Sequence, residues 1–136
     1  MRVSQDIAVG VVMTHGDFPN CLDGPGKWAG FPINGIDEDT YGHLHFQQVK
    51  EAKAPFVMNR KVMNLPRFVT AGQYVLVATG SGQTLGDAQR AAYEVAGKIR
   101  WSSNVMYRTD IGNRVHEQLS TLQKFGYALD MHGELV

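Results

Sequence analysis

Helical periodicity in this sequence begins only after residue 83, and strand-like runs fill the part of the chain before it. Thr84 is a good N-cap, and Asp87 three residues later completes the pattern of a capping box. The apolar positions that then recur at three- and four-residue steps are Leu85, Ala88, Ala92, Val95 and Ile99. This spacing predicts a helix from Thr84 to about Arg100. Because strands come first and helices last, we expect an α+β domain in which a helix packs on a mostly antiparallel sheet.

A second helix is expected after Gly112, with Asn113 as its N-cap and Gly126 as its end. Its buried stripe would consist of Val115, Leu119 and Leu122. The fold class predicted from the sequence is therefore an antiparallel sheet followed by two C-terminal helices.

The strand-like segments are rich in β-branched residues and are separated by turn formers. The segments expected to be strands are Ile7–Thr14, Gly42–Val49, Pro55–Met58, Lys61–Asn64 and two within Arg67–Gly80, joined at Ala71-Gly72-Gln73. Pro66 would limit the fourth of these to a sheet edge, because proline cannot donate to a strand ladder. Gly16–Asp39 is predicted to be a long loop, with room for a short strand at Phe31–Ile36.

Length and charge restrict the class of protein. A chain of 136 residues, 43% of them hydrophobic, is enough for one domain with a core, so we expect residues 1–136 to form a single domain. Thirteen basic and thirteen acidic residues give a net charge of zero, without the positive field that attracts nucleic acid or anionic lipid. We expect neither nucleic acid nor a membrane among its partners.

The N-terminal region and the single cysteine indicate a cytoplasmic location. The apolar run Ile7–Met13 is too short to span a membrane, and no small-residue cleavage site follows it. Cys21 has no second cysteine with which to form a disulfide, which fits a reducing compartment. We expect its thiol to be inert rather than nucleophilic.

The segment Gly80-Ser81-Gly82-Gln83-Thr84 connects an expected strand to a helix N-terminus. Free backbone N–H groups at such a junction suit a phosphate, so Gly80, Ser81, Gly82 and Thr84 are candidates for a phosphate-adjacent turn. The lysine of a P-loop and the third glycine of a dinucleotide fingerprint are both missing. The alternative is a tight turn before a capped helix.

Arg108 and Asp110 stand two residues apart, so in an extended segment both side chains point the same way. A guanidinium and a carboxylate on one surface can orient a phosphate, an amine or a partner protein. Alternatively, they form an internal ion pair in which Asp110 caps the following helix.

Histidines supply the only metal-ligand candidates. His43 and His45 would share a strand face, and His15 with Asp17 forms another nitrogen and oxygen pair. Nothing in their spacing matches a known metal site, so we expect no bound metal.

Several motifs together resemble the C-terminal domain of glycinamide ribonucleotide synthetase, the phosphoribosylamine–glycine ligase family. The motifs are Val9-Gly10-Val11-Val12-Met13, Phe18-Pro19, Val75 to Gly80, Gly82 to Ala88, Ala92-Tyr93, Ile99 and Tyr107-Arg108-Thr109-Asp110-Ile111-Gly112. The last of them is the most specific. The resemblance extends from Ile7 to about Arg114.

The resemblance implies an activity and an architecture. Members of the family are ATP-grasp ligases of purine biosynthesis, which join glycine to 5-phosphoribosylamine and convert ATP to ADP and phosphate with magnesium. Their last domain is a small, barrel-like antiparallel sheet with helices, which closes over the central ATP-grasp domain. By this resemblance, Arg108 would face the ligand or the ATP-grasp partner and Asp110 would orient it.

The chain departs from the family pattern at three places. Gly72-Gln73-Tyr74 stands where the family has a Gly-Gly-Arg turn, and Leu44 to Val49 stands where the family has a His-Ala-Gly-Thr strand. The ATP-grasp and N-terminal domains are absent from this sequence, and with them the residues that hold magnesium and the nucleotide phosphates.

Two functional hypotheses follow. The chain is the C-terminal domain of the ligase, as a fragment or a split subunit, with no catalytic residue or cofactor of its own, while ATP and magnesium bind in the complete enzyme. Its partner would then be the ATP-grasp domain. The alternative is a free-standing binding or regulatory module that kept the fold and lost the chemistry.

Overall fold

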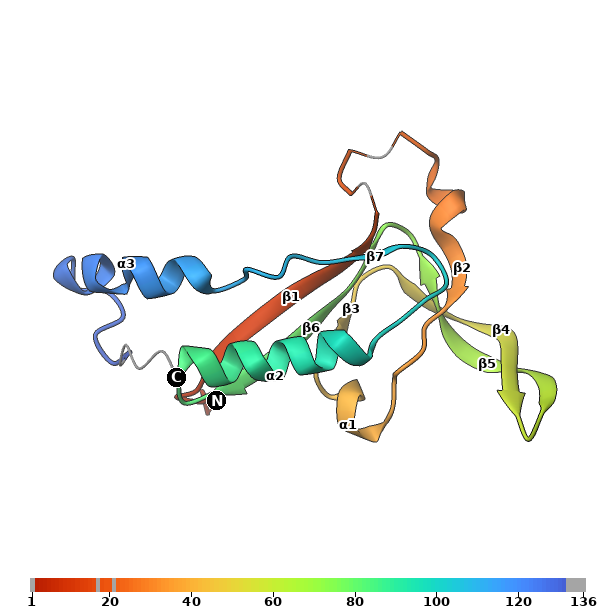
Figure 1. The fold of residues 1–136 in the computed structure, drawn as a ribbon, viewed down its shortest axis with the longest axis horizontal. Coiled ribbons are helices and arrows are strands. Elements are labelled where there is room, and N and C mark those ends of the chain that lie inside the picture. Colours follow the sequence, from red (N-terminus) through yellow and green to blue (C-terminus); the bar gives the residue numbers. More distant parts are fainter. Residues whose placement is uncertain (1, 17, 21, 132–136) are drawn as a thin grey trace.

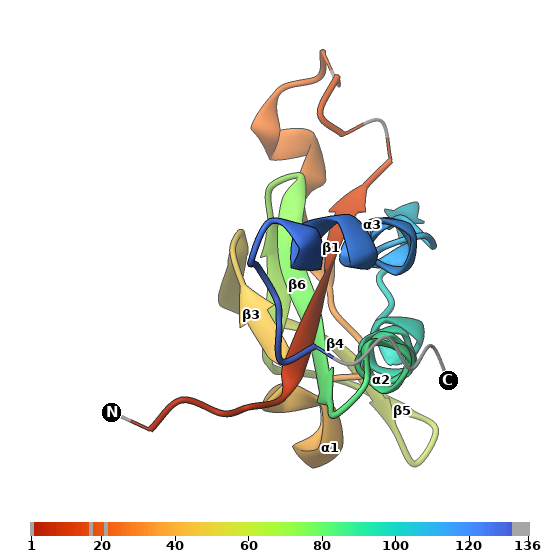
Figure 2. The same cartoon turned by 90° about the vertical axis from the view of Figure 1, so that its left-hand side faces the viewer.

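The computed structural model describes residues 2–16, 18–20 and 22–131, and their strands form two antiparallel sheets. The larger sheet has the order β3-β6-β1-β7, and the smaller one has the order β2-β5-β4. One long helix, α2, lies along the larger sheet (Figures 1 and 2). The expected α+β class is confirmed. The described strands stay in two separate sheets and do not close into a barrel.

The larger sheet is built around the pairing of its two longest strands. β1 (Ile7–His15) runs antiparallel to β6 (Tyr74–Gly82), from the pair Ile7 and Gly82 to the pair Thr14 and Tyr74. The short strands β3 (Leu44–Phe46) and β7 (Val105–Met106) flank this pair. The expected strand at residues 42–49 is thus shorter than predicted.

The smaller sheet is dominated by a long hairpin. β4 (Val49–Met58) pairs along its whole length with residues 61–70 of β5 (Lys61–Ala71), and β2 (Ala29–Pro32) pairs with the last residues of β5. The segments expected at Pro55–Met58, at Lys61–Asn64 and from Arg67 to the Ala71-Gly72-Gln73 turn therefore belong to two strands, both longer than predicted. Pro66 fits inside β5 because only β4 lies beside that part of the strand, so the missing N–H faces no neighbour.

The chain passes from one sheet to the other between β5 and β6. The predicted break at Ala71-Gly72-Gln73 is confirmed, but the two strands that it separates belong to different sheets. The predicted long loop also contains ordered elements besides β2. These are the 3-10 helix η1 (Pro25–Trp28) and the one-turn helix α1 (Glu38–Tyr41).

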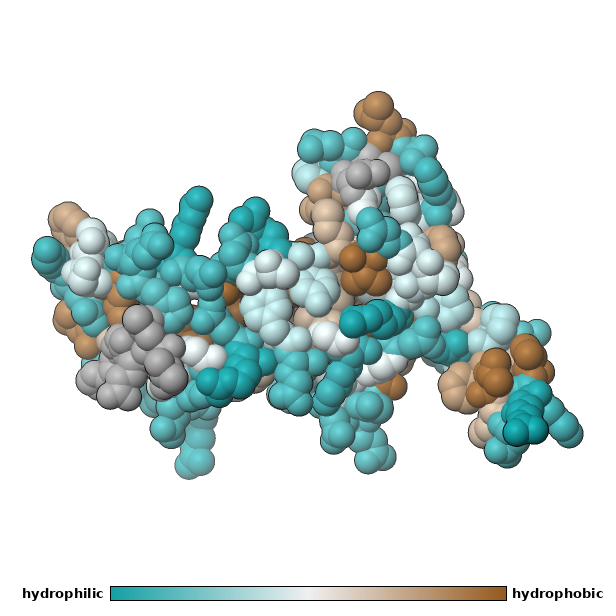
Figure 3. Space-filling view, viewed as in Figure 1, coloured by the Kyte–Doolittle hydropathy of each residue, from teal (hydrophilic) through white to brown (hydrophobic). Residues whose placement is uncertain are grey.

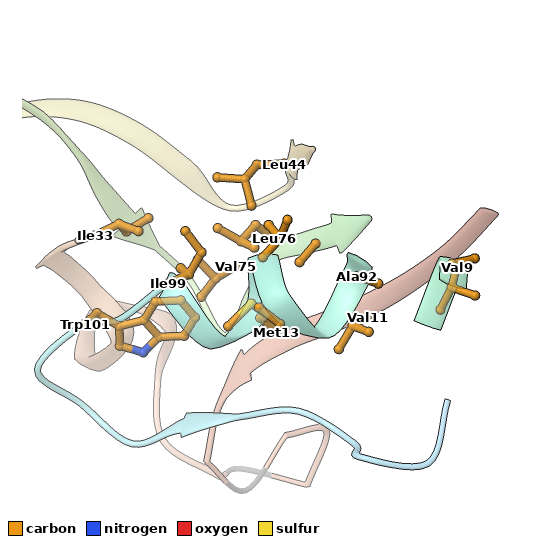
Figure 4. Close-up of a cluster of buried hydrophobic side chains, with 14 of the residues drawn as sticks. Val9, Val11, Met13, Ile33, Leu44, Val75, Leu76, Ala92, Ile99 and Trp101 are labelled. Carbon is orange, nitrogen blue, oxygen red and sulfur yellow. The ribbon is translucent and has the colours of Figure 1, made fainter. Parts of the chain in front are cut away.

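The core lies between α2 (Leu85–Lys98) and the β1–β6 pair. The helix presents alanines to the sheet, and the strands present alternate apolar residues to the helix (Figure 4). The fully buried members include Val11, Met13, Leu76, Ala78, Ala88, Ala92, Ala96 and Ile99. Thr84 caps the helix as predicted, because its hydroxyl accepts a hydrogen bond from the Asp87 N–H.

Gly80 allows the helix to approach this closely. A Cβ atom at Gly80 would lie 2.1 Å from the backbone nitrogen of Ala92 and 2.7 Å from the carbonyl oxygen of Ala88. Neither atom can move without displacing α2. The expected strand–helix junction at residues 80–82 is therefore the end of β6, packed under the helix.

The last helix, α3 (Asn113–Lys124), agrees with the sequence in position but differs in detail. Its N-cap is Gly112, at φ +88°, and Asn113 is the first helical residue. Leu119 is buried, whereas Leu122 is 40% exposed, so the expected stripe is only partly buried. Gly126 ends the helix as predicted, since the Tyr127 N–H bonds to the Leu122 carbonyl around it. None of the helices in the described residues is long and apolar enough to span a membrane.

Replacing Gly80 with alanine tests this packing. We expect Gly80→Ala to lower the free energy of unfolding by about 1–3 kcal/mol or more, because the added methyl group meets helix backbone. Gly97→Ala is the matched control, since Gly97 lies in α2 with nothing within 4 Å of its Cβ position. That change should stabilise by about 0.5–1 kcal/mol. Equal effects in urea denaturation would contradict this account.

Candidate functional site

The segment that contains Arg108 runs back along α2 after the chain leaves β7 (Figure 1). Two side chains of α2 hold it there. The Tyr93 hydroxyl donates a hydrogen bond to the Arg108 carbonyl at 2.8 Å and accepts one from the Ile111 N–H at 3.0 Å. Gln89 Nε2 donates to the Ile111 carbonyl at 2.8 Å and to Asn113 Oδ1 at 3.0 Å. The segment from 108 to 113 is thus fixed to the helix by side chains one turn apart.

Arg108 and Asp110 form a bidentate ion pair at the surface. Arg108 Nε lies 2.8 Å from Asp110 Oδ1, and Nη2 lies 2.6 Å from Oδ2. The side chains are 73% and 51% exposed, so solvent reaches both. The hydrogen bond from Arg108 lowers the pKa of the Asp110 carboxyl, and the same contact raises the pKa of Arg108. Asp110 does not cap α3 with its side chain, because it is its carbonyl oxygen that accepts the Asn113 N–H.

A shallow cleft of about 310 Å³ adjoins this pair. Its lining consists of Arg108, Asp110, Ile111, Gly112, Arg114 and Val115. The first turn of α3 has no side-chain cap, so its partial positive charge adds to that of the two arginines. Such a site can pair with a carboxylate or a phosphate group, and the Asp110 carboxylate fixes the direction of the Arg108 fork.

The residues of the proposed phosphate-adjacent turn lie elsewhere. Gly80, Ser81 and Gly82 pair with β1, and none of the four residues, Thr84 included, lines the cleft beside Arg108. A Cβ at Gly82 would lie 2.6 Å from Asp87 Cβ, so this glycine also permits helix packing. Thr84 Oγ1 donates to Asp87 Oδ2 at 2.9 Å, and hydrogen bonds from Thr84 and Arg90 lower the pKa of Asp87. A carboxylate of the protein itself thus lies at this helix end, and phosphate binding there stays a prediction.

The histidines considered as metal ligands are separated. His15 is fully buried among the rings of Trp28, Phe31 and Trp101, and its Nδ1 lies 3.0 Å from Ser103 Oγ. His43 and His45 are exposed. Asp17 and Cys21 lie outside the described residues. Within the described ranges, no three His, Cys, Asp or Glu side chains are placed to hold a metal ion.

Comparison with known proteins identifies the family of this chain. The family model described as phosphoribosylglycinamide synthetase, C domain, matches residues 8–114. The chain belongs to this family. The match ends at Arg114 and so includes the segment from 108 to 112. It agrees with the range over which the motifs resemble the ligase.

Related proteins carry the same name. The C domain described here is 50% identical over 48 residues to phosphoribosylamine–glycine ligase of Pseudomonas syringae, covering 35% of this chain and 11% of that protein. It is 30% identical over 107 residues to the ligase of Vibrio vulnificus, covering 79% of this chain and 21% of the relative. The crystal structure of the Thermotoga maritima ligase superimposes with a TM-score of 0.53 at 27% identity, over 76% of this chain and 21% of that one. The chain therefore spans at most about a fifth of the relatives that it matches.

Sequence reasoning missed the two residues that position the site. In the sequence, Tyr93 stands out only as part of the family pattern, and Gln89 belongs to none of the motifs. Both stand on the half-buried side of α2, four residues apart, and this i, i+4 spacing of polar side chains was the available signal. Their partners lie 15 or more residues further along the chain, so the spacing alone could not identify them.

Removing the Tyr93 hydroxyl should release the segment without unfolding the C domain. We expect Tyr93→Phe to increase the hydrogen-exchange rate of the Ile111 amide by about tenfold, because that N–H loses its acceptor. Tyr127→Phe, at an exposed tyrosine, is the control and should change nothing. An Ile111 amide equally protected in both variants would show that Tyr93 does not hold the segment.

The buried His15 makes the fold sensitive to acid. Burial lowers its pKa below the ordinary value of 6.5, so the folded chain disfavours the protonated ring. The stability that depends on neutral His15 is complete above pH 6.5 and is lost as the pH falls from 6.5 through the lower folded pKa.

Thermal melting between pH 7.5 and 5 measures this loss. We expect wild type and the exposed-site control His45→Gln to lose stability in parallel. His15→Gln should be less stable throughout but less dependent on pH. A His15→Gln melting profile as steep as that of wild type would contradict the assignment.

Proposed function

We propose that this chain is the C-terminal domain of a phosphoribosylamine–glycine ligase and that it acts together with the ATP-grasp domain of that enzyme. The complete enzyme would join glycine to 5-phosphoribosylamine at the expense of ATP. The chain alone would not catalyse the reaction. The family match over residues 8–114, and the shared name of the relatives, support this proposal.

The Arg108–Asp110 pair is the observation that supports a contact with the ligand or the ATP-grasp domain. Arg108 uses Nε and Nη2 for Asp110, and its Nη1 makes no hydrogen bond within the described residues. The guanidinium is thus oriented by one carboxylate while a second edge points outward to solvent. A surface arginine fixed in this way offers a preformed, charge-assisted contact to a carboxylate or phosphate supplied from outside the chain. We assign that contact to the ligand or to the ATP-grasp domain.

ATP and magnesium would bind in the rest of the enzyme. By the family resemblance, the residues that hold magnesium and the nucleotide phosphates would lie in the ATP-grasp domain. The turn at Gly80, Ser81, Gly82 and Thr84 is the weaker candidate for a phosphate contact, because Asp87 lies at the same helix end.

One observation favours the alternative of a binding module. Tyr74 stands where the family pattern has an arginine, and its ring stacks on Phe18 with 5.9 Å between centroids. This turn therefore packs against the chain instead of presenting a cation. A module would keep the fold but fail to support the reaction, so the same assay separates the two functions.

Reconstitution tests the proposal. The chain is mixed with the Vibrio vulnificus ligase truncated before its C domain, and ADP formation that depends on glycine and phosphoribosylamine is measured. We expect the wild-type chain to restore turnover. Arg108→Ala should reduce the restored catalytic efficiency by about ten- to a hundredfold, because a charge-assisted contact is lost.

Arg90 provides the matched control. It forms a similar exposed ion pair with Asp87 at 2.9 Å, but it lies outside the cleft. Arg90→Ala should leave turnover unchanged. Both variants should have the melting temperature of wild type, because surface ion pairs contribute little to the stability of the fold. No turnover at saturating wild-type chain would refute the ligase assignment, and equal turnover with Arg108→Ala would refute the role of Arg108.

A further inference from the structure

The outer half of the β4–β5 hairpin extends beyond the rest of the molecule (Figure 1). β2 pairs with β5 only at Ala71 and Val69, so the hairpin from about residue 54 to 65 is a two-stranded ribbon. Its turn residues, Asn59 and Arg60, both have positive φ, at 50° and 62°, as in the turns that favour hairpins. The ribbon is therefore a defined structural element with no neighbouring strand.

This ribbon is apolar on both faces. Val57 and Val62 stand opposite each other and are 67% and 71% exposed. On the other face, Phe56 stands opposite Met63, and these are 39% and 41% exposed. The hairpin accordingly shows hydrophobic surface at the lower right of Figure 3. We call residues 56–63 the apolar finger.

Positive charge accompanies the finger. The hairpin carries Lys50, Lys53, Arg60, Lys61 and Arg67 with Glu51 as its single acidic residue, in a chain whose net charge is zero. Arg67 is engaged within the domain, since it donates to the Pro55 carbonyl and lies over the Phe56 ring. Arg60 and Lys61 stand at the apex. The finger thus ends in two cations, with apolar pairs behind them.

We propose that the apolar finger inserts into a groove on the remainder of the ligase, with apolar walls for both faces and carboxylates at its closed end. This inference rests on the proposed function. The finger lies inside the family-matched residues 8–114, and about four-fifths or more of each reported relative lies outside the aligned part. A ribbon with two exposed apolar faces is typical of a binding surface, and its partner would have to enclose both faces. Under the proposed function, the remainder of the ligase is that partner.

The order of charge and apolar surface argues against a lipid surface. A finger inserted into a bilayer would carry Arg60 and Lys61 deepest, where cations are most costly. A protein groove can place carboxylates at that depth. A second copy of the chain is a poorer host, because its acidic cleft at Asp39 and Glu94 is also lined by Lys98 and His43.

The test measures binding of the chain to the truncated Vibrio vulnificus ligase by interferometry, in parallel with restored turnover. Val57→Thr with Val62→Thr keeps the β-branched shape and removes apolar surface. We expect it to weaken binding by about tenfold or more while leaving the melting temperature unchanged. Val3→Thr is the matched control, since Val3 is also 71% exposed but lies outside the hairpin, and it should bind as wild type does. Arg60→Glu should weaken binding most at low salt.

The outcomes separate this inference from the proposed function. If the wild-type chain restores turnover and the double valine variant binds as tightly and is as active, the proposed docking of the finger is overturned. The ligase assignment is then intact. Wild-type chain that neither binds nor restores turnover overturns both. Finger-dependent self-association, or finger-dependent binding to vesicles of phosphatidylcholine and phosphatidylserine, overturns the proposed occupant.

Discussion

The close approach of α2 to the β1–β6 pair is the contact from which the rest of the site follows. It depends on the absence of a side chain at Gly80 and on small residues along the helix face above it. Because the buried side of α2 is thereby fixed, its adjoining side presents Tyr93 and Gln89 at defined positions. Those two side chains hold the chain from 108 to 113, and Asp110 in turn orients Arg108. Packing in the core and the direction of one surface guanidinium are thus linked through the side chains of Tyr93, Gln89 and Asp110.

The domain presents two chemically different surfaces. The cleft beside Arg108 is cationic, shallow and anchored to the core, which suits recognition of a carboxylate or phosphate. The apolar finger belongs to the smaller sheet, β2-β5-β4, and offers hydrophobic area with a cationic tip. In our proposal the finger supplies affinity for the remainder of the ligase, and Arg108 supplies a directed polar contact. Area and direction are therefore provided by different elements, as in many protein interfaces where apolar anchors give affinity and charges give orientation.

The sequence predicted the elements whose signals are local. The N-cap Thr84 and the apolar repeat predicted the helix at residues 85–98, and Gly126 predicted the end of α3. The hairpin strands were predicted too short, one beginning at Pro55 and the other ending at Asn64 before Pro66. Each proline lies where a neighbouring strand is missing on one side, so both strands continue through their prolines.

What the sequence could not show was decided by contacts between distant segments. Gly80 and Gly82 leave room for the backbone and side chains of α2, a contact that their own sequence neighbourhood does not show. His15 lies among three aromatic rings, which come from segments distant in sequence. The candidate pair Arg108 and Asp110 was predicted from a two-residue spacing, and the structure shows them in direct contact.

Hydrogen exchange of the chain with and without the truncated ligase tests the central claim most directly, because it maps the contact without assuming a reaction. The account predicts slower exchange of amides in two segments on addition of the ligase, residues 108–112 and residues 56–63, with the core under α2 unchanged. Protection of neither segment, or protection confined to the region of Gly80 to Thr84, would contradict it.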